Sequence, residues 1–251
     1  MFNAEKTTNE IIDFIREYYK NNNLKGVVIG ISGGKDSGVV AGLFAKALGS
    51  ENVLGVTLPC MSKESDMIDA KRVADFYGFE LINVDLTSSY NSFNEEIKKL
   101  GDFIEEELKN SDINIKPRMR MMSLYYLAAL YSSLKGGTYI VAGTSNKSEK
   151  FVGYFTKGGD SVSDIQVIAD LTVSEVIKVG EYLQVPKEVL YKTPDDGLSG
   201  LTDEEKLGVK YSDIEKYINN EELDENIKSK IEKLHNNSKH KFEIPTYKKA
   251  D

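Results

Sequence analysis

The chain alternates between short apolar runs and longer stretches whose apolar residues follow helical spacing. Runs rich in Val and Ile are typical of strands buried on both faces, and they lie at 26–31, 52–58, 79–85 and 138–143. Strands that alternate with helices across short connections form parallel sheets covered by helices on both faces. We therefore expect an α/β fold with a Rossmann-like open parallel sheet, in one domain spanning residues 1–251.

Apolar residues at intervals of three and four predict the helices. One predicted helix begins at Pro117 and ends in Gly-Gly. Proline is favoured in the first turn of a helix, so we expect Pro117 to open it. This helix is apolar on almost every side, which predicts burial in the core or against another subunit. The expected helices span 7–20, 36–49, 64–78, 92–109, 117–137 and 172–184, with short helical pieces beyond 187.

Composition narrows the classes of partner and site. The 251 residues include 32 Lys plus Arg and 40 Asp plus Glu, a net charge of −8. Proteins that bind long polyanions usually carry a basic excess, so we expect no nucleic-acid partner. One cysteine, Cys60, and an N-terminus unlike a signal peptide favour the cytoplasm, and no apolar run is long enough to cross a membrane. With two histidines in the chain, a bound metal should have oxygen ligands, which favours Mg²⁺.

The segment GISGGKDS, residues 30–37, lies between a predicted strand and a predicted helix. A loop in this position presents successive backbone N–H groups to an anion at the N-terminus of a helix. Its spacing does not match the Walker pattern, because Ile29 and Asp36 stand at the two informative ends, nor the dinucleotide pattern G-x-G-x-x-G. An acid beside phosphates requires a cation, so Asp36 is a predicted ligand of Mg²⁺.

SGGKDS resembles the SGG-x-DS loop of the ATP pyrophosphatase superfamily, whose members react at the α-phosphate of ATP. Three later segments, 114–125, 143–165 and 202–214, together with SKHKFEIP at 238–245, resemble ammonia-dependent NAD synthetases in order and spacing. The resemblance covers roughly residues 26 to 245. It implies a homodimer that converts deamido-NAD, ATP and ammonia to NAD, AMP and pyrophosphate through an adenylated intermediate.

The resemblance also implies roles for single residues. Two acids, Asp36 and Glu149, would hold Mg²⁺. The substrate deamido-NAD would contact Arg118, Lys157, Asp164, His240 and Lys241. The ATP site would consist of Gly30, Ile31, Ser32, Gly33, Gly34, Lys35, Asp36, Ser37, Thr144 and Asp195.

Asp160 and Asp164 are the catalytic candidates, because a carboxylate near the reacting centre can hold ammonium and favour its deprotonation. Arg118 and Arg120 are two positions apart, so on a helix they point in different directions. We expect Arg118 to meet an anionic group of the substrate and Arg120 to form a structural ion pair. His235, on a charged helix, is expected to be exposed.

Two positions depart from the family pattern. Val173 stands where a phosphate-facing lysine is common, and Asp195 stands where Ser or Thr is usual. Both changes should weaken ATP binding unless Lys35, which many relatives lack, or an additional metal at Asp195 compensates. Two structural alternatives stay open: Thr144 as a helix cap, and Glu149 as a surface acid beside neighbouring lysines.

Two other functions stay open as well. SGGKDS also occurs in tRNA-modifying enzymes, although those generally need several cysteines, whereas Cys60 is expected to be an inert thiol at a strand end. A non-catalytic nucleotide-binding module is the second alternative. Glutamine-using NAD synthetases carry an N-terminal amidase domain, and only 29 residues precede Gly30, so ammonia is the expected nitrogen donor. Segments 86–91 and 193–202 are the expected lids over the site.

Overall fold

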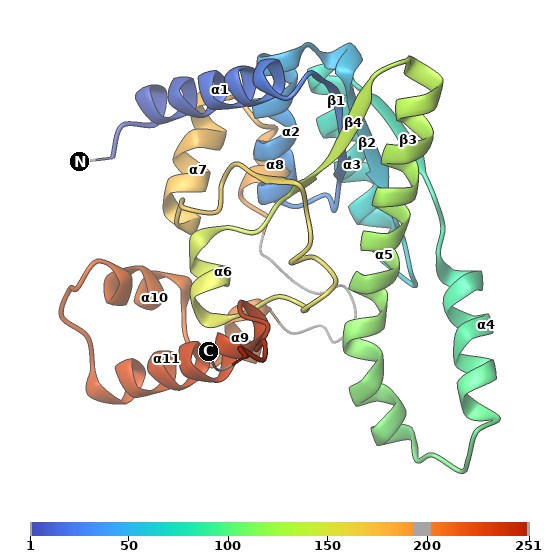
Figure 1. Cartoon of the computed structure of the whole chain (residues 1–251). Helices are drawn as coiled ribbons and strands as arrows, with labels where there is room; N and C mark the ends of the chain where they lie inside the picture. Colours follow the sequence, from blue (N-terminus) through green and yellow to red (C-terminus); the bar gives the residue numbers. More distant parts are fainter. Residues whose placement is uncertain (1, 193–201, 250–251) are drawn as a thin grey trace.

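A parallel sheet forms the centre of the computed structural model, which describes residues 2–192 and 202–249. In that part of the chain its five strands lie in the order β3-β2-β1-β4-β5 (Figure 1). This arrangement confirms the predicted α/β fold with an open parallel sheet. The strands are Leu24–Gly30 (β1), Val53–Thr57 (β2), Glu80–Asn83 (β3), Thr138–Gly143 (β4) and Ile165–Gln166 (β5).

The central strand β1 shows why apolar runs predicted the sheet. Val27, Val28 and Ile29 are all fully buried, although successive side chains of a strand point to opposite faces. On one side Val28 is in register with Leu54 of β2, and on the other with Val141 of β4. A strand with neighbours on both edges and helices on both faces has no polar surface to present, so its sequence is apolar throughout.

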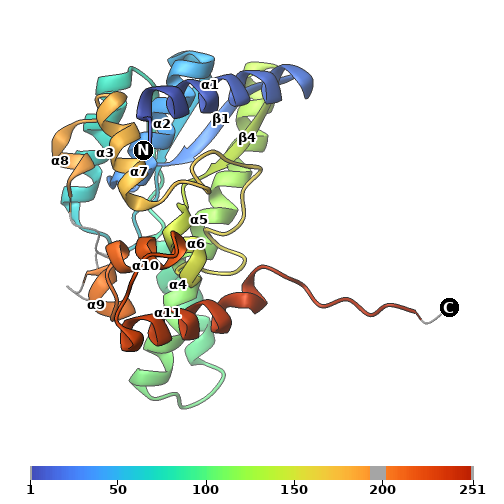
Figure 2. The same ribbon diagram turned by 90° about the vertical axis from the view of Figure 1, so that its left-hand side faces the viewer.

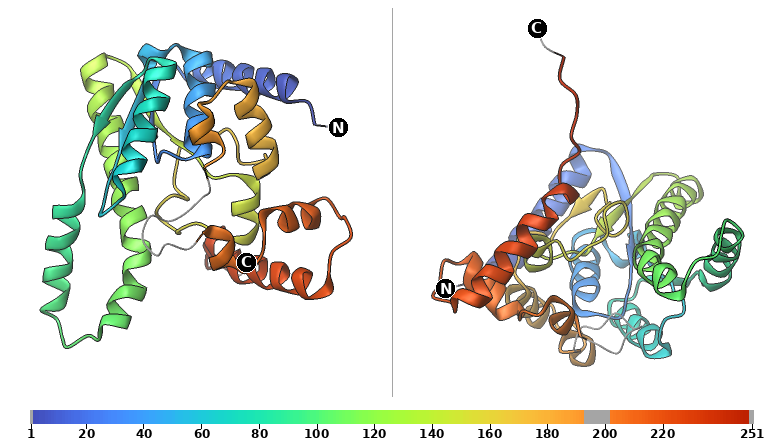
Figure 3. Two further views of the ribbon diagram at one scale, coloured as in Figure 1. Left: turned by 180° about the vertical axis from the view of Figure 1, so that it is seen from behind. Right: turned by 90° about the horizontal axis from the view of Figure 1, so that it is seen from below.

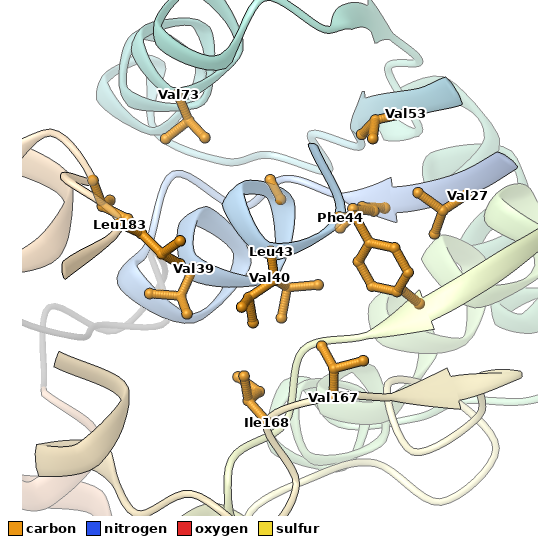
Figure 4. Packing of buried hydrophobic residues seen from close by; sticks show 14 of the residues in the cluster. Val27, Val39, Val40, Leu43, Phe44, Val53, Val73, Val167, Ile168 and Leu183 are labelled. Carbon is orange, nitrogen blue, oxygen red and sulfur yellow. The ribbon is translucent and has the colours of Figure 1, made fainter. Parts of the chain in front are cut away.

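Five helices cover one face of the sheet (Figure 1). Their buried side chains form the largest core cluster, with Phe44 and Leu43 of α2 between Val27 of β1 and Ile168 in the segment after β5 (Figure 4). This face contains α1 (Ala4–Asn21), α2 (Lys35–Leu48), α3 (Glu64–Tyr77), α7 (Val173–Tyr182) and α8 (Lys187–Leu190). A short 3-10 turn, Ser50–Asn52, leads from α2 into β2.

The long helix α5 (Glu105–Lys135) covers the other face and is accompanied by α4 (Thr87–Lys98). Leu127 of α5 is buried in one cluster with Val28, Leu54 and Tyr139. The N-terminal half of α5 and α4 form a hairpin that extends beyond the sheet, opposite the C-terminal helices (Figures 1 and 3). An exposed face of this hairpin therefore stands away from the core.

The prediction that Pro117 opens a helix was wrong. Helix α5 begins at Glu105 and runs through Pro117, which lies in its interior. Proline cannot donate the hydrogen bond that an interior N–H makes to the residue four positions earlier, so α5 lacks one bond there. The predicted helix 92–109 was also wrong in extent, because α4 ends at Lys98 and the chain restarts where the Ile104 N–H donates to Glu107 Oε2 over 3.0 Å.

A third group of helices packs together below the sheet (Figure 1). Val152, Tyr211, Ile214 and Ile231 form its buried cluster. The tail after these helices extends away from the molecule (Figure 2). The group contains α6 (Lys147–Val152), α9 (Asp203–Leu207), α10 (Tyr211–Ile218), α11 (Glu225–Ser238) and a 3-10 turn, Lys239–Lys241. None of the helices in the described ranges is long and apolar enough to span a membrane.

Candidate active site

The loop 30–37 leads from the carboxyl end of β1 into the N-terminus of α2. Its buried Ser37 braces the loop from inside, since the Ser37 hydroxyl donates to the Gly34 carbonyl over 3.0 Å and accepts from the Ser32 N–H over 3.2 Å. No side chain caps the first turn of α2. Its N–H groups are therefore available to an anion, as predicted for a phosphate loop.

Gly33 fits its position for two reasons. Its φ angle of +78° lies in the left-handed region that side chains disfavour. A Cβ atom on Gly33 would also stand 2.4 Å from the Asp66 carbonyl oxygen at the start of α3. The loop can approach α3 this closely only with glycine at that position.

Asp36, in the first turn of α2, has a partner on each carboxylate oxygen. Lys35 Nζ lies 3.1 Å from Asp36 Oδ2, and Asn146 Nδ2 donates to Asp36 Oδ1 over 3.1 Å. Lys35 is only 6% exposed. Burial alone would lower the pKa of Lys35, but the carboxylates of Asp36 and Glu149 outweigh it and raise that pKa, so Lys35 remains a cation.

Glu149 reaches the same place from the first turn of α6. Its Oε2 accepts from the Asn146 N–H over 3.2 Å, while Asn146 Oδ1 accepts from the Glu149 N–H over 3.0 Å. This reciprocal cap holds α6 in place. Glu149 is half-buried, and desolvation together with Asp36 raises its pKa well above the usual value, against the opposing effect of Lys35.

The structure therefore brings Asp36 and Glu149 together from two strand ends, and it settles two alternatives. Asn146 rather than Thr144 caps α6, so the alternative of Thr144 as a helix cap does not hold. The lysines near Glu149 have other partners. Lys147 Nζ pairs with Asp170 Oδ1 at 2.9 Å, and Lys150 Nζ donates to Gln166 Oε1 over 2.8 Å. Glu149 is thus not a surface acid paired with its neighbours.

The donor set at Asp36 and Glu149 fits Mg²⁺. Magnesium prefers oxygen ligands and is often bound by one or two carboxylates, with water and substrate phosphates completing its shell. A second cation between the two acids would relieve the repulsion that raises the pKa of Glu149. No cluster of three or more His, Cys, Asp or Glu suited to a metal occurs in the described ranges, so phosphate and water would supply the other ligands.

A cavity of about 420 Å³ opens beside this acid pair. Lys35 lines it, and its Nζ lies 6.0 Å from the centroid of the Tyr211 ring. Val173, one of the two positions that depart from the family pattern, lines the same cavity. The Tyr211 hydroxyl is buried without a hydrogen-bond partner in the described structure, and burial followed by Glu149 raises the pKa of Tyr211.

Four of the five residues predicted to hold deamido-NAD, all except Asp164, come together from three distant segments. The Arg118 Nε and Nη2 atoms donate to the Lys157 carbonyl over 3.3 and 3.2 Å, and Lys157 Nζ donates to the His240 carbonyl over 2.6 Å. Lys241 Nζ donates to the carbonyls of Gly153 and Phe155, each over 2.7 Å. Burial lowers the pKa of Lys241. The cations of Arg118, Lys157 and Lys241 thus gather beside His240, and these four residues form the cationic group of the site.

The two catalytic candidates lie in the same loop region. Val141 N donates to Asp164 Oδ2 over 2.8 Å, and the Tyr125 hydroxyl of α5 donates to Asp164 Oδ1 over 3.1 Å. Thr156 N donates to Asp160 Oδ1 over 2.7 Å. Asp160 keeps an exposed surface, yet the groups packed around its carboxylate desolvate it and raise its pKa.

Three sequence expectations need correction or lie outside the described residues. Arg120 points away from Arg118 as predicted, but its Nε donates to the Leu58 carbonyl over 3.1 Å rather than to an acid, so the expected ion pair was wrong. His235 is half-buried, not exposed, and stacks on the Phe151 ring at 4.5 Å. Asp195, with residues 193–201 of the expected lid segment 193–202, lies outside the described residues.

Sequence reasoning missed Asn146, Tyr125 and Tyr211. The N-x-x-E spacing of Asn146 and Glu149 directly after a strand is the signature of a capping box, which could have identified Asn146. Tyr125 is the last residue of the segment 114–125 that carries the arginines, and it shares their helix. Tyr211 lies in the segment 202–214 that carries part of the family resemblance, but no residue pattern there indicates that its side chain lines a cavity.

Comparison with known proteins decides the family. The family model described as NAD synthase matches residues 7–245. The chain belongs to the NAD synthase family. The NH(3)-dependent NAD(+) synthetase of Carboxydothermus hydrogenoformans is 37% identical over 244 residues, 97% of either chain. This membership gives no support to the tRNA-modifying alternative.

Two solved structures of the family resemble the fold closely. The NMN synthetase of Francisella tularensis has a TM-score of 0.87 and 31% identity, with 99% of each chain covered. The NH3-dependent NAD synthetase of Campylobacter jejuni, solved with nitrate ion, has a TM-score of 0.76 and 29% identity, covering 99% of this chain and 100% of that one. The family thus includes structures titled for two different products.

Proposed function

We propose that this protein is an ammonia-dependent NAD synthetase, which amidates deamido-NAD with ammonia and cleaves ATP to AMP and pyrophosphate. The observation that carries the proposal is that this member of the family contains two groups of residues suited to phosphate-bearing ligands. One group is the phosphate loop with Asp36 and Glu149, and the other is the cationic group of Arg118, Lys157, His240 and Lys241. Together they suit two ligands that both bear phosphates.

The phosphate loop serves the leaving group. The nicotinic carboxylate of deamido-NAD attacks the α-phosphorus of ATP, the bond to the bridging oxygen breaks, and pyrophosphate departs with the electron pair. Backbone N–H groups of the loop and the start of α2, with the Ser32 hydroxyl at the loop surface and Lys35, stabilise the charge that develops on pyrophosphate. Bound Mg²⁺, held by Asp36 and Glu149, would neutralise further phosphate charge.

The second half of the reaction needs an uncharged ammonia molecule. Ammonia attacks the adenylated carbonyl carbon, AMP leaves, and the surplus proton passes to a base. Asp164 is held by Tyr125 and Val141, so its carboxylate has a defined orientation. Asp160 has a raised pKa, which brings it nearer to the range where a carboxylate exchanges protons. We assign ammonium capture to these two acids.

A second candidate substrate is the mononucleotide that corresponds to deamido-NAD. The observation in its favour is the TM-score of 0.87 to the Francisella structure, which is titled an NMN synthetase. Amidation of either substrate uses the same carboxylate and the same nitrogen donor. The two substrates differ only by the AMP half of the dinucleotide, so assays with each substrate in turn distinguish the two activities.

We further propose a homodimer of single-domain subunits. Four side chains spaced four apart on α5 form an exposed apolar stripe: Met122, Tyr126, Leu130 and Leu134. A stripe of this kind on the outer face of a helix supports contact with a second subunit. The one cysteine, Cys60, is buried and unpaired, which supports the cytoplasmic location expected from the sequence.

The test supplies ATP, Mg²⁺ and ammonium with either deamido-NAD or the mononucleotide, and follows AMP and the amidated product together. Equal amounts of AMP and NAD from the dinucleotide would support the main proposal. Turnover restricted to the mononucleotide would favour the second candidate, and AMP without amide would indicate another acceptor. Absence of AMP with both substrates would favour a non-catalytic binding module. Replacing ammonium by glutamine tests the nitrogen donor.

A further inference from the structure

The ammonium group of Lys35 occupies the place where a cation is needed beside Asp36. It stands 3.1 Å from Asp36 Oδ2, and the two side chains are only 6% and 17% exposed. The other oxygen of Asp36 accepts from Asn146 Nδ2 at 3.1 Å. Both oxygens of this carboxylate are therefore already engaged, one of them by a full positive charge.

The charges of three acids act on this ammonium. Asp36 is in direct contact, and Glu149 and Asp203 act on it electrostatically from α6 and α9. A partly buried carboxylate pair without a cation is costly, because repulsion between the acids adds to their desolvation. Lys35 thus offsets the charge of the acid pair in the protein alone.

A metal cannot use the same oxygen without disturbing this arrangement. Mg²⁺ binds carboxylate oxygens at about 2.0–2.1 Å, which would place it near an ammonium that is itself in contact with Asp36 Oδ2. Two cations that close together in a partly buried site repel strongly. Either the lysine leaves Asp36 or the metal does not bind there.

The adjoining cavity offers the lysine another place. Lys35 lines this space of about 420 Å³ together with Tyr211, Val173 and Asp203. The Tyr211 ring already lies 6.0 Å from the ammonium, within the range of a cation–π contact. A rotation of the lysine side chain therefore moves its charge into a space that is lined by an aromatic ring and an acid.

We propose that Lys35 holds the place of the metal in the ligand-free protein, and that Mg²⁺ binds at Asp36 by displacing this ammonium into the adjoining cavity. This rests on the proposed function, which makes Asp36 and Glu149 the metal ligands. The displaced ammonium then becomes available to the phosphates that arrive with the metal. Lys35 is accordingly an internal competitor of Mg²⁺ as well as a phosphate ligand.

The test measures Mg²⁺ binding by calorimetry in metal-free protein, with neither ATP nor substrate present. Lys35→Met should bind Mg²⁺ on the order of tenfold more tightly than the unaltered protein, because the competing charge is gone. Lys192→Met is the matched control. Lys192 lines the same cavity but pairs with Asp66 and Asp69, at 2.9 and 2.7 Å, so its loss should leave Mg²⁺ affinity unchanged.

Equal or weaker binding of Mg²⁺ by Lys35→Met would overturn the proposal. Lys35→Gln, which keeps a polar side chain, serves if the methionine variant does not fold, and it should change the affinity in the same direction. Asp36→Asn distinguishes a failure of this proposal from a failure of the proposed function. It should abolish binding in either background, and if it does not, the metal site of the proposed function is itself misplaced. NAD formation is measured apart from all these titrations.

Discussion

The guanidinium of Arg118 donates two hydrogen bonds to the backbone carbonyl of Lys157, at 3.3 and 3.2 Å, although 39 residues separate them. One helix thereby fixes the loop that carries Lys157, and Lys157 in turn reaches the His240 carbonyl. Nε and Nη2 each use a hydrogen on this contact, so the other N–H groups of the fork remain for a substrate anion. The Arg118 side chain thus holds the Lys157 loop and still has donors for a substrate anion.

Arg118→Lys is expected to raise KM for deamido-NAD about 10- to 100-fold, because a lysine cannot hold the carbonyl and the substrate in one planar fork. The KM for ATP should change far less. Steady-state kinetics with each substrate varied in turn measures both. Arg16→Lys is the matched control, since Arg16 also donates to two backbone carbonyls, of Lys46 and Ala47, on the far surface. Equal effects on both KM values would contradict the assignment.

Lys241→Met should destabilise the protein and weaken deamido-NAD binding. Lys241 Nζ satisfies the carbonyls of Gly153 and Phe155, and its loss leaves both without that donor. We expect the free energy of unfolding to fall by about 1–3 kcal/mol, measured by chemical denaturation. Lys239→Met, two residues earlier and exposed, should change neither quantity. A stable Lys241→Met with unaltered KM would show that the contact has no role in binding.

Glu149→Gln should stabilise the metal-free protein at neutral pH. The pKa of Glu149 is raised in the folded protein, so the folded state binds its proton more tightly than the unfolded chain. Stability therefore falls as pH rises from the usual carboxyl pKa through the raised one. Glutamine removes that loss and retains an oxygen for the Asn146 N–H.

The melting temperature reports the effect of Glu149→Gln. It should rise by roughly 2–4 °C per kcal/mol of relieved repulsion, and the gain should disappear in acid, where Glu149 is protonated in both states. The variant should also lose most of the stabilisation that Mg²⁺ gives the unaltered protein. A lower melting temperature at neutral pH in the absence of metal would contradict the raised pKa.

The apolar stripe on α5 leads to a prediction about assembly. Tyr126→Glu with Leu134→Glu introduces two charges at positions that are 71% and 67% exposed, which should convert a dimer to a monomer in sedimentation equilibrium. Leu100→Glu is the control, because Leu100 is 75% exposed but lies between α4 and α5, off the stripe. If the unaltered protein is monomeric at micromolar concentration, the stripe is not a subunit interface.

Much of the fold follows from sequence because buried strands leave a clear pattern. The apolar runs around Val27 and Val141 predicted β1 and β4, and Gly78 predicted the end of α3, where its φ of +76° closes the helix. The strand β5 has only two residues and leaves no such pattern. The helix start predicted at Pro117 was wrong for a physical reason. Local propensity disfavours proline inside a helix, but Ile115 and Met119 on either side of it pack against the core and α5 stays continuous.

The candidate site could be predicted for residues that directly follow parallel strands, because all such strands end at the same edge of the sheet. Asp36 and Glu149 follow strand ends at the same edge of a parallel sheet, so their meeting could be expected. The cationic group was expected from family resemblance, but its mode of assembly, through the Lys157 and His240 carbonyls, was not. Backbone acceptors in loops depend on tertiary packing, which no residue pattern records.

One continuous helix, α5, carries both residues of the candidate site and the apolar stripe proposed as the subunit interface. It carries Arg118, which holds Lys157, and Tyr125, which holds Asp164, while its outer side bears the stripe from Met122 to Leu134. A second subunit bound at the stripe would contact the same helix that positions the loop carrying Lys157. If association in the proposed dimer shifts this helix, subunit association and deamido-NAD binding change each other's free energy by the same amount. The apparent affinity for deamido-NAD should then differ above and below the dissociation constant of the proposed dimer.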